Sequence, residues 1–209
     1  MRKIGIVACG RGLRLDEFPA GATVVRCDEA RLRSLAEEGR LDEMAELILG
    51  ALRSLAGEGC ELAALTGSDA HLVFSAVRQL SPVPLVSMVE ACRERILAQG
   101  FGRAMLLGSA LTLRRKFFKS PIVLAHVPVV VPGGEDARWL DEFLAGEGAV
   151  DAQAIERFRH MVAEGMDHGA EVLVLSDPAL LSLAEASDAT LPVIDAAQVQ
   201  REALLLQAL

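Results

Sequence analysis

Residues 58–76 read EGCELAALTGSDAHLVFSA, and this stretch decides the fold class. A short buried strand is predicted at residues 62–65, because a run of apolar residues there is followed at once by a small polar turn. The turn, Thr66-Gly67-Ser68-Asp69, leads into a second apolar segment that we expect to be helical. In open α/β sheets, ligands bind at the carboxyl ends of the strands, where such turns lie. The stretch therefore predicts an α/β protein with a binding turn at this point.

A second strand, turn and helix of the same shape is predicted at residues 169–183, with Ser176-Asp177-Pro178 at its turn. Further strands are expected at residues 4–8, 23–26, 85–86, 104–107, 122–131 and 192–194, and helices at 41–55, 88–99, 136–144, 152–164, 178–186 and 197–209. Strands that alternate with helices, without hairpin signals, indicate parallel sheets flanked by helices. Because the pattern begins again near residue 100, two similar lobes are expected rather than one long sheet.

Composition narrows the classes of partner. The formal net charge is −8, which argues against nucleic acid or an anionic membrane surface as a partner. Hydrophobic residues make up 52% of the chain, but the longest apolar run, residues 122–131, is interrupted by His126 and Pro128 and is too short to span a bilayer. The N-terminus leads directly into a strand without the architecture of a signal peptide. We therefore expect a cytoplasmic protein that binds a small molecule.

Neither the cysteines nor the first glycine pair predict a metal or cofactor site. The four cysteines have no CxxC pair and no ligand spacing, so they are expected to be small buried apolar residues; Cys9 alone ends a strand near the predicted site. The Gly10-Arg11-Gly12 turn lacks the rest of a nucleotide-binding motif, which favours a tight loop. Arg11 is either a ligand for a substrate carboxylate or a solvated surface arginine.

Several stretches together resemble the cofactor-independent aspartate/glutamate racemase family. Residues 59–71, GCELAALTGSDAH, resemble the family's strand that ends in CNTAH. Residues 106–112, LLGSALT, resemble its LLATxGT turn, and residues 169–178, GAEVLVLSDP, resemble its GAxxIILGCTE. Residues 83–90, VPLVSMVE, and residues 192–195, PVID, are also similar to family segments. The resemblance is spread in order over almost the whole chain.

The resemblance implies two α/β lobes related by a pseudo-twofold axis, with the active-site cleft between them and the last helix returning to the first lobe. The expected lobes are residues 1–98 plus 195–209 and residues 99–194. It also implies a homodimer, a small carboxylate or amino acid as substrate, and an isomerase that needs neither cofactor nor metal. In the family, one cysteine thiolate removes the α-proton and a second thiol protonates the opposite face, which suits a group whose pKa can lie near working pH.

Both catalytic cysteines of the family are replaced here. The first position falls on Gly67, which has no side chain that transfers a proton, and the second falls on Asp177. We treat Asp177 as the candidate catalytic residue, acting as a single base or, if burial raises its pKa, as an acid. The alternative is that Asp177, directly before Pro178, is an ordinary helix N-cap.

The polar residues of the turns are the candidate substrate-binding residues. They offer backbone N–H groups and hydroxyls after strands, which suits an oxyanion, although the same residue types also cap helices. His71 matches the family's histidine and is either a substrate contact or a buried structural residue. With Arg11, the candidates are Gly67, Ser68, Asp69, His71, Ser109, Thr112 and Ser176.

Three functions stay open at this stage. The first is a divergent isomerase that acts on a small carboxylate or amino acid. The second is a pseudoenzyme that retains the site for binding only, which the loss of both thiols favours. The third is a lyase, because arylmalonate decarboxylases resemble racemases that carry glycine at the first cysteine position; those enzymes keep the second cysteine, where this chain has Asp177.

Overall fold

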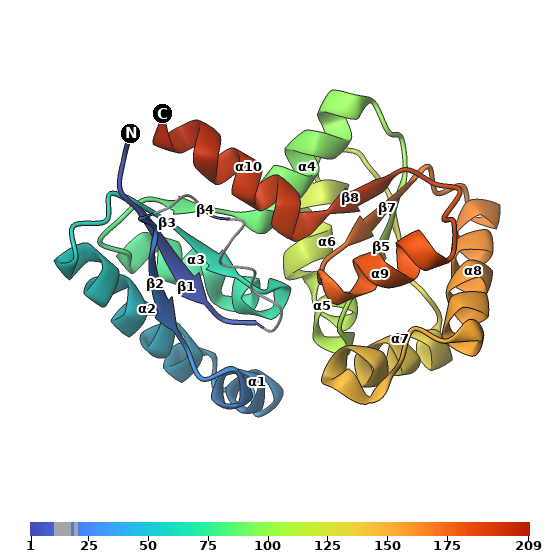
Figure 1. Ribbon diagram of the computed structural model, residues 1–209, viewed down its shortest axis with the longest axis horizontal. Helices are drawn as coiled ribbons and strands as arrows, with labels where there is room; N and C mark the ends of the chain where they lie inside the picture. The colour runs from blue at the N-terminus through green and yellow to red at the C-terminus, as the bar shows by residue number, and fades with distance from the viewer. Residues whose placement is uncertain (11–17, 19–20) are drawn as a thin grey trace. The chain divides into compact units, whose positions relative to one another are not determined.

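The computed structural model describes residues 1–10, 18 and 21–209 (Figure 1). The chain divides into two compact units, Met1–Ala91 with Gln200–Leu209, and Cys92–Val199. The predicted Arg11 contact lies outside the described residues. Among the helices described, none is both long and apolar enough to cross a membrane.

The first unit is built on a parallel sheet with the strand order β2-β1-β3-β4. All five residues of the central strand β1 are buried, as expected of a parallel strand covered on both faces. The strands are β1 (Ile4–Ala8), β2 (Thr23–Arg26), β3 (Leu62–Thr66) and β4 (Leu85–Val86).

Helices cover both faces of this sheet, and alternate residues of β1 point toward opposite faces. Ile4 and Ile6 pack in one cluster with Leu204 of α10, whereas a side chain at Gly5 would contact Leu55 of α2. The helices of this part are α1 (Glu29–Glu37), α2 (Leu41–Gly57), the 3-10 helix η2 (Ser68–Val73), α3 (Phe74–Leu80), α4 (Met88–Gln99) and α10 (Ala196–Ala208). Residues of α4 and α10 belong to both units.

The second unit repeats the same plan, with the strand order β6-β5-β7-β8 and all pairs parallel. Its strands are β5 (Ala104–Leu107), β6 (Val129–Val130), β7 (Val172–Leu175) and β8 (Val193–Asp195). The second strand of each unit in chain order, β2 in the first unit and β6 in the second, therefore lies at an edge of its sheet beside the first strand. The prediction of two similar α/β lobes with parallel sheets is confirmed.

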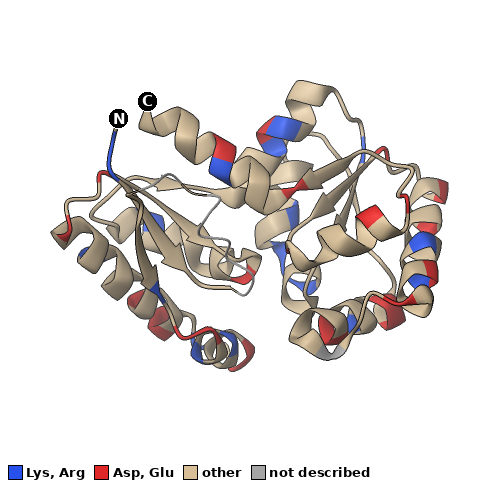
Figure 2. Ribbon diagram, in the orientation of Figure 1, with Lys and Arg blue, Asp and Glu red and all other residues tan. Residues whose placement is uncertain are grey.

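Helices flank the second sheet, and the fully buried rings of Phe118 on α6 and Phe158 on α8 anchor two of them. The helices are α5 (Ala110–Arg114), α6 (Lys116–Val123), α7 (Gly134–Glu142), the π-helix η3 (Phe143–Glu147), α8 (Ala152–Asp167) and α9 (Ala179–Ala186). Charged residues gather on the helices and are sparse on the strands of both sheets (Figure 2).

The predicted strand at residues 122–131 is wrong. Its first residues complete α6, and only Val129–Val130 forms a strand. The helix ends in a Schellman motif: His126, at φ 65°, donates its N–H to the Val123 carbonyl, and Val127 donates to the Ile122 carbonyl. An apolar run cannot distinguish a buried helix end from a buried strand, and the histidine that marks the stop is not the usual glycine.

Candidate functional site

The turn after β3 is shaped by close packing between two glycines. Gly67 has φ 84° and ψ 126°, a conformation that disfavours any L side chain. A Cβ atom at Gly67 would lie 3.1 Å from both Cα and N of Gly10, which follows β1. Glycine is therefore required at this turn by backbone conformation and by packing, and a cysteine side chain does not fit there without movement of the Gly10 backbone.

His71 joins this turn to the start of α4. Its Nδ1 lies 3.3 Å from the Gly67 carbonyl, and its Nε2 accepts a hydrogen bond of 3.1 Å from the N–H of Met88. Burial lowers the pKa of His71 to about 4, against the opposing effect of the Gly67 carbonyl. The ring is thus neutral near pH 7, and it stacks on Phe74 with centroids 4.9 Å apart. One ring nitrogen contacts the backbone of the turn and the other the first residue of α4, so His71 is a positioning residue in this structure.

Other side chains stiffen the same edge of the first sheet. Gln200 of α10 is buried, and its amide donates to the carbonyl oxygens of Leu65 at 2.9 Å and Val86 at 3.0 Å. Ser68 is buried and Asp69 is half-buried, and both lie in the first turn of η2. Gln200 was not a candidate at the sequence level, because nothing in a helical apolar segment signals that an amide reaches two strand ends.

In the second unit, Ser109 and Thr112 form the cap of α5. The Ser109 hydroxyl oxygen accepts the Thr112 N–H at 3.1 Å and lies 3.2 Å from the Thr112 hydroxyl. Both residues are buried. The backbone N–H of Ala110 donates to the carboxylate of Asp141 on α7 at 2.9 Å. A carboxylate of the chain itself thus occupies a backbone donor at this turn, and no sequence pattern predicts this contact between residues 31 positions apart.

Ser176, at the end of β7, carries a buried hydroxyl without a hydrogen-bond partner among the described residues. The residue is 1% exposed. The Ser176 hydroxyl lies close to the Gly108 backbone, because a Cβ atom added at Gly108 would overlap this hydroxyl. The same Cβ atom would lie 3.5 Å from Thr112 Cγ2. Ser109, Thr112 and Ser176 therefore lie together as a group at the carboxyl ends of β5 and β7.

Asp177 takes the geometry of a helix cap. Its Oδ1 accepts the backbone N–H of Ala179 at 2.9 Å, and the residue is half-buried. Asp195, at the end of neighbouring β8, makes the equivalent bond to the Ala197 N–H, also at 2.9 Å. The carboxylate of Asp177 is thus held at the strand end next to Ser176, so the cap and a position suited to chemistry coexist in one residue.

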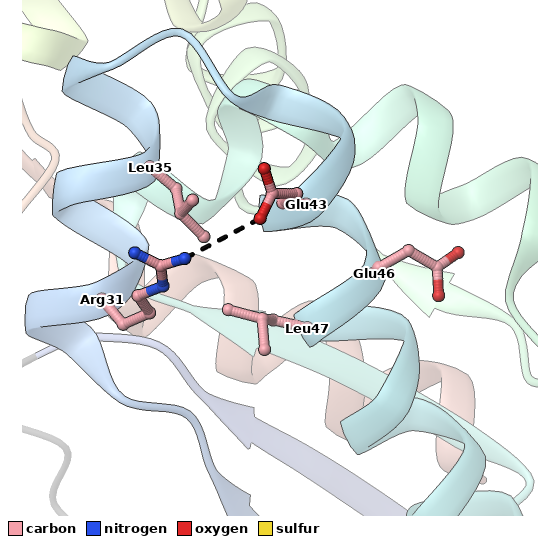
Figure 3. A pocket seen from close by; sticks show the side chains of 5 residues that line it. All are labelled: Arg31, Leu35, Glu43, Glu46 and Leu47. Carbon is pink, nitrogen blue, oxygen red and sulfur yellow. Dashed lines mark ion pairs between the residues drawn. The ribbon is translucent and has the colours of Figure 1, made fainter.

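A metal cluster and a separate pocket are two other kinds of site that a protein of this fold could carry. No group of three or more His, Cys, Asp or Glu side chains in the described ranges is arranged to hold a metal ion. A pocket of about 290 Å³ lies between α1 and α2 (Figure 3). It is lined by Arg31, Leu35, Glu43, Glu46 and Leu47, with an ion pair of 3.8 Å between Arg31 and Glu43. None of the predicted site residues lines it, so we do not assign it to the site.

Each unit carries polar side chains at the carboxyl ends of its parallel sheet, which is where α/β proteins bind ligands. A family profile described as Asp/Glu/Hydantoin racemase matches residues 14–204. The chain therefore belongs to the Asp/Glu/hydantoin racemase family. A search of curated proteins by sequence gave no match.

Solved structures share the fold at low sequence identity. A Yersinia pestis protein assigned as an Asp/Glu racemase superposes with a TM-score of 0.84 at 19% identity, covering 100% of this chain and 99% of the other. An aspartate racemase homologue from Pyrococcus horikoshii gives 0.81 at 22% identity, with coverages of 100% and 99%. Unliganded arylmalonate decarboxylase gives 0.61 at 13% identity, with coverages of 100% and 93%. These similarities establish the fold.

Proposed function

We propose that this protein binds a small carboxylate, such as an amino acid, and catalyses a cofactor-independent isomerisation at its Cα. Asp177 is the proposed base: its carboxylate removes the Cα proton, a water molecule donates a proton to the opposite face to give the other stereoisomer, and the proton on Asp177 is then lost to solvent. The proposed ligand contacts in the second unit are Ser109, Thr112 and Ser176. In the first unit they are Gly67, Ser68 and Asp69, on the turn that His71 positions.

The buried hydroxyl of Ser176 is the observation that carries this proposal. Most buried polar groups in proteins have a hydrogen-bond partner, and leaving one unpaired costs about 1–3 kcal/mol. The unpaired hydroxyl of Ser176 stands beside the proposed base, at the carboxyl end of a parallel strand, where α/β proteins bind ligands. A ligand oxygen that accepts from this hydroxyl would remove the cost.

Thiols are excluded from the proposed chemistry of the second unit. Its single cysteine, Cys92, is fully buried on α4, and burial raises the pKa of its thiol well above the usual range. We therefore propose a carboxylate, that of Asp177, rather than a thiol as the base in the second unit.

The second candidate function is binding without catalysis. The Gly67 turn, which has no room for a thiol, and the use of Asp177 Oδ1 as a cap favour it. A lyase that decarboxylates an arylmalonate-like diacid is the third, supported by glycine at the first cysteine position. We also propose that the protein is a cytoplasmic homodimer; its free cysteines fit a reducing compartment, and light scattering tests the dimer.

One experiment separates the three. A thermal-shift screen with aspartate, glutamate, hydantoins and arylmalonates identifies ligands, and NMR in D₂O then follows deuterium incorporation at Cα of each. We expect exchange with the wild type and at least a 100-fold loss in Asp177→Asn, because an amide cannot act as the base. Ligand binding without exchange supports the pseudoenzyme, and release of CO₂ from an arylmalonate supports the lyase.

The matched control is Asp151→Asn. Asp151 caps α8 in the same unit, and its Oδ1 accepts the Ala154 N–H at 2.8 Å. Asparagine caps helices about as well as aspartate, so both variants are expected to fold. Full exchange activity in Asp177→Asn would refute Asp177 as the base, and an equal loss in Asp151→Asn would assign the effect to stability.

A further inference from the structure

Two cysteines meet at the carboxyl edge of the first sheet. The parallel register of β1 and β2 pairs Ala8 with Arg26, and the N–H of Cys27 donates to the Ala8 carbonyl at 2.9 Å. Cys9 and Cys27, the next residue of each strand, are therefore neighbours, and their thiols are joined by a hydrogen bond. They are 18 positions apart in the sequence and follow different strands, so no short motif announces the pair.

The two thiols have different environments. Cys9 is 6% exposed, whereas Cys27, directly after the edge strand β2, is half-buried. The hydrogen bond from the Cys9 thiol lowers the pKa of Cys27, outweighing burial, while the same contact and burial raise the pKa of Cys9 well above its usual range. Cys27 is thus the more accessible sulfur and the one whose pKa is lowered, and Cys9 is the buried thiol in contact with it. Reactive thiols are of the first kind, low in pKa and accessible.

We propose that Cys9 and Cys27 form a peroxide-reactive dithiol site, in which Cys27 is oxidised first and Cys9 closes an intramolecular disulfide. The Cys27 thiolate attacks hydrogen peroxide, breaks its O–O bond and, with one proton taken up, gives Cys27 sulfenic acid and water. The Cys9 sulfur then attacks the Cys27 sulfur, the sulfenic oxygen leaves as a second water, and the disulfide remains. Two thiols are oxidised and one peroxide is reduced.

The site adjoins the turn of the proposed ligand contacts, although the proposal is independent of any enzyme activity. The Cys9 N–H donates to the hydroxyl of Thr66 at 3.4 Å, and a Cβ at Gly67 would lie 3.3 Å from the Cys9 carbonyl carbon. We therefore expect disulfide formation to change the backbone conformation of Thr66 and Gly67 first.

The test is peptide mapping after treatment with hydrogen peroxide under native conditions. Trypsin places the four cysteines in four separate peptides, residues 4–11, 27–31, 54–78 and 79–93. We expect the peptide of residues 4–11 to be linked to that of residues 27–31, with loss of two hydrogen atoms. Cys60 and Cys92, which are buried, serve as internal controls and are expected to stay reduced.

Two variants test the order of the steps. Cys9→Ala removes the resolving thiol, so Cys27 is expected to stop at the sulfenic acid, which dimedone traps, and its alkylation at pH 7 is expected to slow several-fold because its pKa rises. Cys27→Ser is expected to leave Cys9 reduced. If peroxide leaves Cys9 and Cys27 of the wild type both open to alkylation, or links either to Cys60 or Cys92, the proposal is refuted.

Discussion

Gly67→Ala is expected to destabilise the first unit by about 2–6 kcal/mol. At φ 84° and ψ 126° an L side chain is strained by about 1–3 kcal/mol. Its Cβ would also lie 3.1 Å from the Cα and N of Gly10, closer than ordinary van der Waals contact. Forcing an extra carbon atom into a packed site lowers the free energy of unfolding by a further ~1–3 kcal/mol. The contact is with backbone, which cannot rotate away, so we expect the two costs to add.

Two other glycines separate these costs. Gly39 has φ 73° with open space around its would-be Cβ, so Gly39→Ala measures the conformational cost alone, about 1–2 kcal/mol. Gly50 lies inside α2, also with open space, so Gly50→Ala is expected to stabilise by about 0.5–1 kcal/mol. Urea denaturation followed by circular dichroism gives all three differences on one scale.

The series has a clear refuting outcome. If Gly67→Ala costs no more than Gly39→Ala, the packing between Gly67 and Gly10 does not restrict the turn, and the argument against a thiol there is wrong. In that case Gly67→Cys, which introduces the residue that the resembled family carries, would be stable. From the approach of Gly10 we expect Gly67→Cys to be at least as unstable as Gly67→Ala.

Two further predictions concern buried polar groups. The pKa of His71 falls from 6.5 to about 4 on folding, so the unfolded chain binds the extra proton and stability is lost as pH falls from about 6.5 toward 4. The pKa difference corresponds to about 3 kcal/mol of folding free energy lost between pH 7 and pH 4. Because glutamine does not titrate, urea denaturation should show that His71→Gln loses about 3 kcal/mol less than the wild type over this range. Equal losses would contradict the neutral histidine. Ser176→Ala should raise stability by about 1 kcal/mol, since it removes an unpaired buried hydroxyl, and should weaken the thermal shift caused by any ligand. A less stable Ser176→Ala protein would mean that the hydroxyl is paired after all.

Periodicity located most strands because a buried parallel strand is a continuous apolar run between turn residues. The strands at residues 4–8, 23–26, 85–86 and 104–107 have the predicted bounds. It missed α1, a nine-residue helix with only three buried residues, because a short polar helix has little apolar pattern to detect. It also expected an ordinary helix directly after the Gly67 turn, where a 3-10 helix precedes α3.

The candidate residues divide in a similar way. Strand-end turns can be located from the sequence, which is why four residues of the second unit could be named as candidates: Ser109, Thr112, Ser176 and Asp177. The shared sheet brings them to one edge. The structural role of His71 could not be chosen beforehand, since a histidine one turn into a helix looks alike in both roles. Its two partners, Gly67 and Met88, are 4 and 17 residues away in the sequence, and only folding brings the second into contact.

The sequence by itself determined the α/β class, the duplicated plan and the family. These follow from local apolar runs, turn residues and the identity of single positions. The tertiary structure alone decided that Gly67 is required by the approach of Gly10, that Ser176 has an unpaired hydroxyl and that Cys9 meets Cys27. Each of these depends on contacts between strands that are far apart in the chain, and such contacts leave no periodic signal.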